Sequence, residues 1–298
     1  MHLACLMALG ACVAASSRPM AEAPRETTLA FGGDVLLGRG VVARAREEGW
    51  DAVLDPVRRW LGSADLSVIN LESPVGPCLD GGTVSYPRLC GDPAAVPALS
   101  RAGVDAAVLA NNHALDGGTS GLEQTARLLR RHAIEPLGVE AALTGRPTAE
   151  RIGPYAILAA NLTFGAHEPG RAVPVPSPSD LAVAVGHARL SAPDVPLVVV
   201  LHAGREGWPH AQPADLSYAR RVVEAGADAV VMQGAHVVRT LLRDPVPVHF
   251  GLGNLIFDQR SPSARVGAVL TLASSAGRRL RVLSARCVRG SAEVACPE

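Results

Sequence analysis

Five short polar motifs follow apolar runs of strand length, and this arrangement constrains the fold more than any other feature of the sequence. In an α/β sheet the carboxyl ends of the strands form the rim where ligands bind. The sequence therefore predicts that these motifs meet at one rim. Asp, Glu, Asn and His offer lone pairs to divalent cations, so we expect a metal site, which proteins use most often for hydrolysis. The motifs are Gly32-Gly33-Asp34, Asn70-Leu71-Glu72, Asn111-Asn112-His113, His202 and Gly234-Ala235-His236.

Strand patterns and helix patterns alternate along most of the chain. This alternation predicts one domain over residues 28–298, with a mostly parallel central sheet, helices outside it and antiparallel strands at the end. We expect strands at 28–31, 66–71, 106–110, 155–162, 197–201, 229–232, 248–252, 266–272 and 280–285. We expect helices at 41–48, 52–61, 93–102, 119–131 and 216–225.

Charge and missing motifs exclude several function classes. The chain has 28 Lys and Arg against 28 Asp and Glu, so its formal net charge is zero. Nothing electrostatic favours a nucleic-acid backbone or an anionic membrane, and no nucleic-acid partner is expected. The sequence also lacks a Gly-x-Ser-x-Gly elbow, a phosphate-binding Gly-Lys-Ser/Thr loop and a dinucleotide fingerprint after the first strand.

Residues 1–15 are apolar but too short to cross a membrane, and they are typical of a secretory leader without its basic region. Leu9-Gly10-Ala11-Cys12 also matches a lipobox, so Cys12 is either a lipid attachment site or an incidental cysteine of a plain signal peptide. Residues 16–27 are expected to form a flexible tether. The chain is therefore expected to be exported to the cell surface or periplasm.

Cysteine usage agrees with export. Outside the leader the chain has Cys78, Cys90, Cys287 and Cys296, which allow three pairings, and the most local is Cys78–Cys90 with Cys287–Cys296. Disulfides persist in oxidising compartments. The alternative is four free thiols in a cytosolic protein.

Each candidate ligand has a structural alternative. Asp34 either binds metal or caps the next helix. Glu72 ends an apolar run, where a buried carboxylate is costly unless it binds a metal or pairs with an arginine. Asn111, Asn112 and His113 follow another apolar run, where asparagine could also simply form the turn.

The later motifs follow the same rule. A lone histidine at a strand end is more often structural than a ligand, but His202 opens His-x-Gly-x-Glu, in which Glu206 could orient a ligand histidine. His236 follows the next predicted strand, and Asn254 and Asp258 follow the one after. We expect supporting roles, behind the ligands, for Asn70, Asn111, Glu206, Asn254 and Asp258.

Six motifs together resemble the CapA family, named for capsule and poly-γ-glutamate biosynthesis. They are Gly-Gly-Asp-Val-Leu-Leu-Gly-Arg, Asn-Leu-Glu-Ser-Pro-Val, Ala-Asn-Asn-His-Ala-Leu-Asp, His-Ala-Gly-Arg-Glu, Gly-Ala-His-Val-Val and Gly-Leu-Gly-Asn-Leu-Ile-Phe-Asp-Gln, and they span residue 28 to about 260 in the family's order. The family is similar to calcineurin-like metallophosphoesterases. The resemblance implies a four-layer α/β sandwich with a central dinuclear metal site.

The resemblance also implies roles for individual residues. Asp34, Glu72, Asn112, His202 and His236 match the metal ligands, with Glu72 in the place of the bridging carboxylate. His113 matches the histidine that protonates the leaving group. Arg39 would hold an anionic substrate, because a guanidinium suits phosphate or carboxylate oxygens.

Two departures from the phosphoesterase pattern concern the second metal position. Leu36 stands where those enzymes usually have a histidine, and Val238 stands where a second late histidine would be.

Three functions follow as expectations. The first is a hydrolase that uses one or two Mn, Zn or Fe ions and acts on poly-γ-glutamate or a phosphoester. The second is a non-catalytic accessory that binds the anionic polymer or its membrane-bound synthase. A cytosolic phosphoesterase is a third reading if the leader is misread.

Overall fold

A computed structural model describes residues 26–79, 87–163, 173–274 and 277–296. The predicted leader, with Cys12, and residues 16–25 of the predicted tether lie outside the described residues. The first strand among the described residues is β1 (Thr27–Val35).

Within the described residues, the first sheet has eight strands. Its order is β14-β13-β12-β1-β2-β3-β4, and β11 pairs with the end of β1. Strands β1 to β4 run parallel, whereas β12, β13 and β14 are antiparallel to their neighbours. The antiparallel end predicted from the sequence is thus confirmed. Besides β1, the strands are β2 (Leu66–Leu71), β3 (Ala106–Val108), β4 (Glu135–Leu137), β11 (Asn254–Ile256), β12 (Gly267–Ser274), β13 (Leu280–Arg289) and β14 (Ala292–Val294).

The second sheet has six strands in the order β5-β6-β7-β8-β10-β9. Its centre is parallel, and β5 and β9 pair antiparallel at the two edges. The strands are β5 (Ala149–Ile152), β6 (Tyr155–Asn161), β7 (Leu197–His202), β8 (Ala229–Gln233), β9 (Leu241–Leu242) and β10 (Val248–His249). The expected single central sheet is therefore two sheets.

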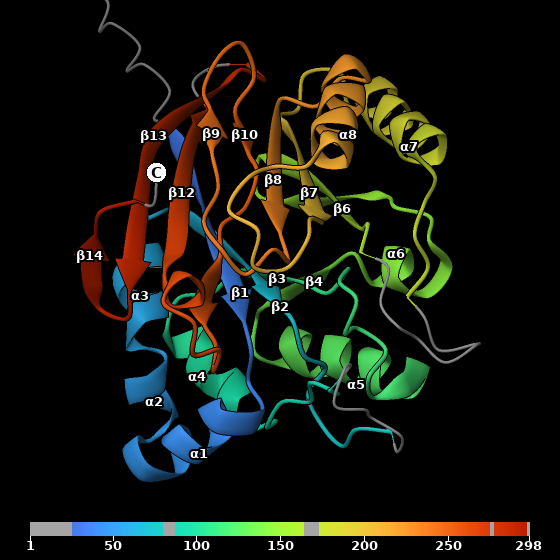
Figure 1. Cartoon of the computed structure of the whole chain (residues 1–298). Helices are drawn as coiled ribbons and strands as arrows, with labels where there is room; N and C mark the ends of the chain where they lie inside the picture. The colour runs from blue at the N-terminus through green and yellow to red at the C-terminus, as the bar shows by residue number, and fades with distance from the viewer. Residues whose placement is uncertain (1–25, 80–86, 164–172, 275–276, 297–298) are drawn as a thin grey trace, which may run out of the picture.

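The sheets pack face to face, and helices cover their outer faces (Figure 1). One buried cluster joins the sheets, with Phe31 and Val68 from the first and Tyr155 and Val198 from the second. A second cluster lies under α1 to α5, and a third under α7 and α8. Three cores between four layers make the α/β sandwich that the resemblance implied. The helices are α1 (Arg39–Glu48), α2 (Trp50–Val53), α3 (Asp55–Leu61), α4 (Ala95–Arg101), α5 (Gly118–Arg131), α6 (Val139–Thr144), α7 (Pro178–Ser191) and α8 (Pro213–Glu224), with a 3-10 turn η1 (Ser263–Arg265).

Most predicted helices are present with shifted ends. The helix expected over 52–61 is divided into α2 and α3 at Leu54, where φ is −94° and ψ is 4°. Pro56 lies in the first turn of α3 and has no N–H for a continuing helix, which is why a new helix starts there. Helix α5 buries Leu122, Ala126 and Leu129, the apolar stripe that its sequence predicts.

Both local disulfides are present, Cys78–Cys90 and Cys287–Cys296. Each helix among the described residues is too short or too polar to cross a membrane.

Candidate metal centre

The carboxyl ends of strands from both sheets meet at one buried site. Asp34 lies near the end of β1 and Glu72 directly after β2, while His202 ends β7 and His236 follows β8. One ligand atom each from Asp34, Glu72 and His202 lies within 4.8 Å of the others. The site therefore lies where the two sheets face each other, which explains why residues almost 170 positions apart are neighbours.

Asp34 is held in place by neighbours from three segments. Its Oδ1 accepts a hydrogen bond from Asn70 Nδ2 at 2.8 Å, and its Oδ2 accepts one from the Gly234 N–H at 3.2 Å. Gly33 allows β1 to lie close to the backbone at Gly253, because a Cβ at position 33 would lie 2.0 Å from the Gly253 carbonyl oxygen. The capping alternative is wrong, because Gly38 is the residue at the start of α1.

Glu72 is the residue that most needs a cation. It is fully buried, and neither carboxylate oxygen has a hydrogen-bond partner. The nearest basic groups recorded in the described structure are His236 Nε2 at 3.5 Å and His202 Nε2 at 3.6 Å from Oε1, and no arginine is paired with it. Burial raises the pKa of Glu72 well above its usual value. An unsatisfied buried carboxylate facing two imidazoles fits a divalent cation.

His202 is buried as a neutral imidazole, the form that binds metals. Burial lowers the pKa of His202 to about 3. Its Nδ1 lies 3.2 Å from Asn70 Nδ2, so Asn70 orients both His202 and Asp34. The following turn makes room for the ring, since a Cβ on Gly234 would lie 2.6 Å from His202 Nε2.

His236 contacts both carboxylates. Its Nδ1 lies 3.2 Å from Asp34 Oδ2 and 2.9 Å from Asn254 Oδ1. Burial alone would lower the pKa of His236, but the negative charges of Glu72 and Asp34 outweigh it and raise the value to about 10. The protonation of Glu72 and that of His236 are therefore linked, and a metal ion held by these two residues would compete with their protons.

The turn after β3 carries the Asn-Asn-His motif. Asn111 ties this turn to β2 by donating from Nδ2 to the Leu71 carbonyl at 2.9 Å and to Asn70 Oδ1 at 3.2 Å. Asn112 is half-buried in the same turn. His113 is buried, and its Nδ1 lies 2.7 Å from Asp116 Oδ2. Asn111 is thus a structural tie, and His113 is oriented by a carboxylate.

The predicted supporting residues form two groups. Asn254 lies behind His236, with its Oδ1 2.9 Å from His236 Nδ1, and its supporting role stays a prediction. Glu206 is exposed and accepts from Gln259 Nε2 at 2.7 Å, and Gln259 in turn accepts from Asn254 Nδ2. Asn70 contacts His202 directly. Asp258 is paired with Arg39.

Arg39, predicted to hold substrate, forms a two-point ion pair with Asp258. The distances are 2.7 Å from Nη2 to Oδ1 and 3.0 Å from Nε to Oδ2. The side chain keeps 38% of its surface exposed. Its role in binding an anion stays a prediction.

Sequence reasoning missed three residues around the centre. Asp116 lies three positions after His113 inside the same motif, and that spacing was the available signal. Gln233 ends β8 and donates to the Gly32 carbonyl at 2.9 Å, which joins the two sheets. Arg239 is buried and holds the loop after His202, and it gives no local sequence signal.

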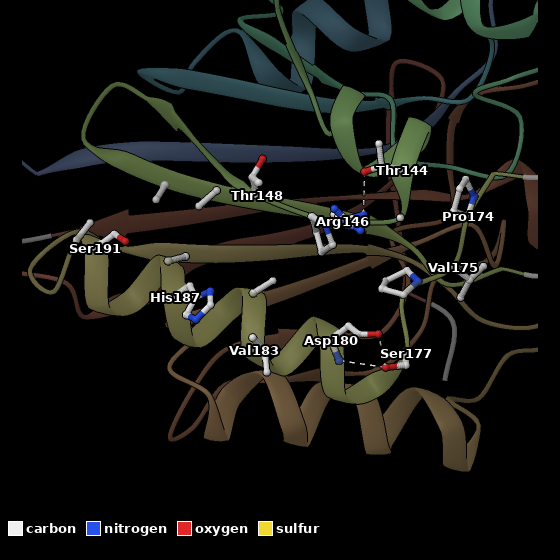
Figure 2. A pocket seen from close by; sticks show the side chains of 18 of the residues that line it. Thr144, Arg146, Thr148, Pro174, Val175, Ser177, Asp180, Val183, His187 and Ser191 are labelled. Carbon is white, nitrogen blue, oxygen red and sulfur yellow. Dashed lines mark hydrogen bonds between the residues drawn. The ribbon is translucent and has the colours of Figure 1, made fainter.

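The cavity with the largest volume among those described lies away from the candidate metal ligands. This cavity of about 860 Å³ lies between α6, β5 and α7 (Figure 2). Arg146, Arg151 and His187 line it, and none of the candidate metal ligands does. It carries no cluster of metal-binding groups within the described residues.

Comparison with known proteins agrees with this geometry. A probable polyglutamine synthesis accessory protein of Mycobacterium tuberculosis is 28% identical over 294 residues, which cover 80% of this chain and 76% of that protein. The capsule biosynthesis protein CapA of Bacillus anthracis is 26% identical over 249 residues, which cover 78% of this chain and 60% of that protein. The crystal structure of a novel phosphatase from Mycoplasma pneumoniae superposes with a TM-score of 0.52 at 13% identity, covering 89% of this chain and 93% of that one, and shares the fold.

The sequence model of the bacterial capsule synthesis protein PGA_cap matches residues 28–259, a span that runs from the first strand to just beyond Asp258. This span includes every candidate ligand. The chain belongs to the PGA_cap family of bacterial capsule synthesis proteins.

Proposed function

We propose that this chain is an exported, metal-dependent hydrolase that acts on poly-γ-glutamate, or on a phosphoester, during capsule formation at the cell surface. Family membership and the phosphatase-like fold support the proposal. The observation that carries it is the buried Glu72 carboxylate, which has no hydrogen-bond partner and faces His202 and His236 beside Asp34.

The ion would be held by Asp34, Glu72, His202 and His236, with Asn112 as the amide ligand. These donors suit Mn, Zn or Fe, at one or two ions per chain. When bound, such an ion supplies Lewis acidity, which activates water and polarises the scissile group.

His113 would supply the proton that the leaving group needs. Asp116 holds Nδ1 at 2.7 Å, which leaves Nε2 as the ring nitrogen that can release a proton. The arrangement resembles other sites in which a carboxylate fixes the orientation of an acid–base histidine. His113 is therefore the general acid in this proposal, and Asp116 is a positioning residue.

Export is supported by the disulfides Cys78–Cys90 and Cys287–Cys296, which persist in oxidising compartments. The names of the relatives connect them with capsule or PGA biosynthesis. For this chain we propose attachment to the cell surface, with Cys12 as the site of a lipid anchor, and contact with membrane-bound synthase components.

Elemental analysis of the purified chain tests the metal site. We expect about one or two equivalents of a transition metal, and their loss in Glu72→Gln. Glu123→Gln, on the exposed face of α5, is the matched control and should keep the metal. A metal-loaded chain would then be assayed on poly-γ-glutamate and on phosphoesters, and His113→Ala should abolish turnover.

One observation favours a non-catalytic accessory instead. Leu36 is buried in the core beneath the helices, and Val238 is buried between the sheets. Neither position supplies a ligand where phosphoesterases have histidines, so the second metal position is the weaker one. An absence of metal after incubation with Mn, Zn and Fe, together with retained polymer binding, would support the accessory function and contradict the hydrolase.

A further inference from the structure

We propose that a pocket lined by four arginines, beside the metal centre, binds the carboxylates of an extended polyanion. This arginine pocket has a volume of about 530 Å³ and lies between the start of α1 and the segment 254–260. The identity of the polymer, poly-γ-glutamate, rests on the proposed function. The four arginines are Arg44, Arg260, Arg265 and Arg289.

The pocket concentrates positive charge in a chain whose formal net charge is zero. Asp258 is the one carboxylate among the lining residues, and Arg39 is paired with it. In the described part of the chain, Arg260, Arg265 and Arg289 are exposed and form no ion pair, while Arg44 pairs with Glu48 on the same helix. At least three guanidinium groups are therefore available to an anion.

The inner wall of the arginine pocket is also part of the metal centre. Asn254 lines the pocket and contacts His236 Nδ1 at 2.9 Å. Phe257 lines it too, and its ring centroid lies 4.9 Å from that of His236. Gln259 completes the wall by accepting from Asn254 Nδ2 at 2.9 Å. An anionic chain in the pocket would therefore lie next to a ligand histidine.

The exposure of the arginines indicates a polymer and not a small anion. A single exposed ion pair contributes little, because solvent screens it. Several guanidinium groups that engage successive carboxylates of one chain gain from effective concentration, and each can bind a carboxylate through two parallel hydrogen bonds. The arginine pocket thus suits a polycarboxylate much better than free glutamate.

Binding of fluorescently labelled poly-γ-glutamate, followed by anisotropy, tests the inference. We expect Arg260→Ser/Arg265→Ser/Arg289→Ser to weaken binding roughly tenfold or more. The control removes three positive charges elsewhere, in Arg127→Ser/Arg146→Ser/Arg220→Ser, and should bind like the wild type. Equal affinity of the two triple variants would overturn the inference. Should the first variant unfold, Arg260→Glu at an exposed position tests the same expectation.

Two further arms separate this inference from the hydrolase proposal. Binding is repeated after metal removal with a chelator, and metal content is measured on each variant. Polymer binding that persists without metal, and that needs the arginines, supports the pocket even if no turnover is found. If the arginine triple variant binds the polymer normally and keeps its metal and its turnover, the proposed role of the pocket is contradicted. The hydrolase proposal is unaffected by that result. Tighter binding of polyphosphate than of poly-γ-glutamate would overturn the choice of a polycarboxylate.

Discussion

Gly234 allows the His202 ring to pack closely against the turn after β8, because it has no side chain. Its φ of 92° lies in the left-handed region, and a Cβ would lie 2.6 Å from His202 Nε2. We expect Gly234→Ala to lower the free energy of unfolding by about 2 kcal/mol or more and to weaken metal binding by displacing the imidazole. Urea unfolding and metal titration measure the two effects.

The control variant Gly207→Ala introduces backbone strain without a steric clash, so it separates the strain at Gly234 from the clash with His202. Gly207 has a φ of 73°, and nothing lies within 4 Å of a Cβ built there. This variant should lose about 1 kcal/mol and keep its metal affinity. Equal loss of metal in both variants would show that the approach of His202 is not what Gly234 provides.

Asp116 is expected to act by orienting His113, the proposed general acid. Asp116→Asn keeps an oxygen for the Leu89 N–H, which Oδ2 accepts at 2.6 Å, but removes the negative charge beside His113 Nδ1. We expect kcat to fall roughly 100-fold with metal content and KM unchanged. Steady-state kinetics against Asp194→Asn, an exposed control, would check this, and an unchanged kcat would contradict the positioning role of Asp116.

The sequence predicts which side chains meet at the centre better than it predicts what they contact. A polar residue at a strand end is read from local pattern alone, which is why Asp34, Glu72 and His202 could be grouped in advance. Partners are set by long-range packing. Arg39 and Asp258, which form an ion pair, are 219 residues apart, and Asn70 and His202, whose side chains are in contact, are 132 apart.

At the scale of elements, Arg239 fastens the loop between β7 and α8. Its buried guanidinium donates to the Arg205 and Trp208 carbonyls, both at 2.8 Å, and to Asp215 Oδ2 at 3.0 Å. Gly204 lies directly beneath it, since a Cβ there would lie 2.4 Å from Nη1. The glycine of His-x-Gly-x-Glu is therefore explained by this arginine.

Arg239→Met should cost about 3 kcal/mol or more of unfolding free energy, because it leaves the buried Asp215 carboxylate without its cation. The double variant Arg239→Met/Asp215→Asn should recover more than about 1 kcal/mol of that loss, as expected for residues in direct contact. Denaturant unfolding of the four proteins in this cycle measures the coupling. Strictly additive losses would contradict the role given to the pair.

The division into two sheets could not be read from local pattern. Apolar runs such as those of β2 and β7 are alike whether their strands pair with each other or stack face to face. Strand β4 contains Pro136, which argues against a central strand, and it does lie at a sheet edge. The expectation of four layers therefore came from the family resemblance and not from the periodicity of the sequence.

At the scale of the whole molecule, His249 makes stability depend on pH. Burial, aided by the charge of Arg243, lowers the pKa of His249 to about 4. An unfolded histidine titrates near 6.5, so the unfolded chain binds this proton first as the pH falls. The contribution of neutral His249 to the free energy of unfolding is fully present above about pH 6.5 and is lost as the pH falls toward 4. The total loss is about 3 kcal/mol.

His249→Asn removes this contribution while retaining an acceptor for the Gly251 N–H. Urea unfolding at pH 7 and pH 4.5 should show a smaller loss of stability for this variant than for the wild type. His187→Gln, at an exposed position on α7, should retain the wild-type loss. Identical pH dependence in all three proteins would contradict the assignment to His249.

Strand β1, which carries Asp34, pairs with β2 on one side and with β12 on the other. The family match ends at residue 259, whereas β12 begins at Gly267. A chain cut at the end of the match would leave the first strand with an open edge, ready to pair with the same edge of another molecule. The end of the family match and the end of the first sheet are therefore different places in this protein.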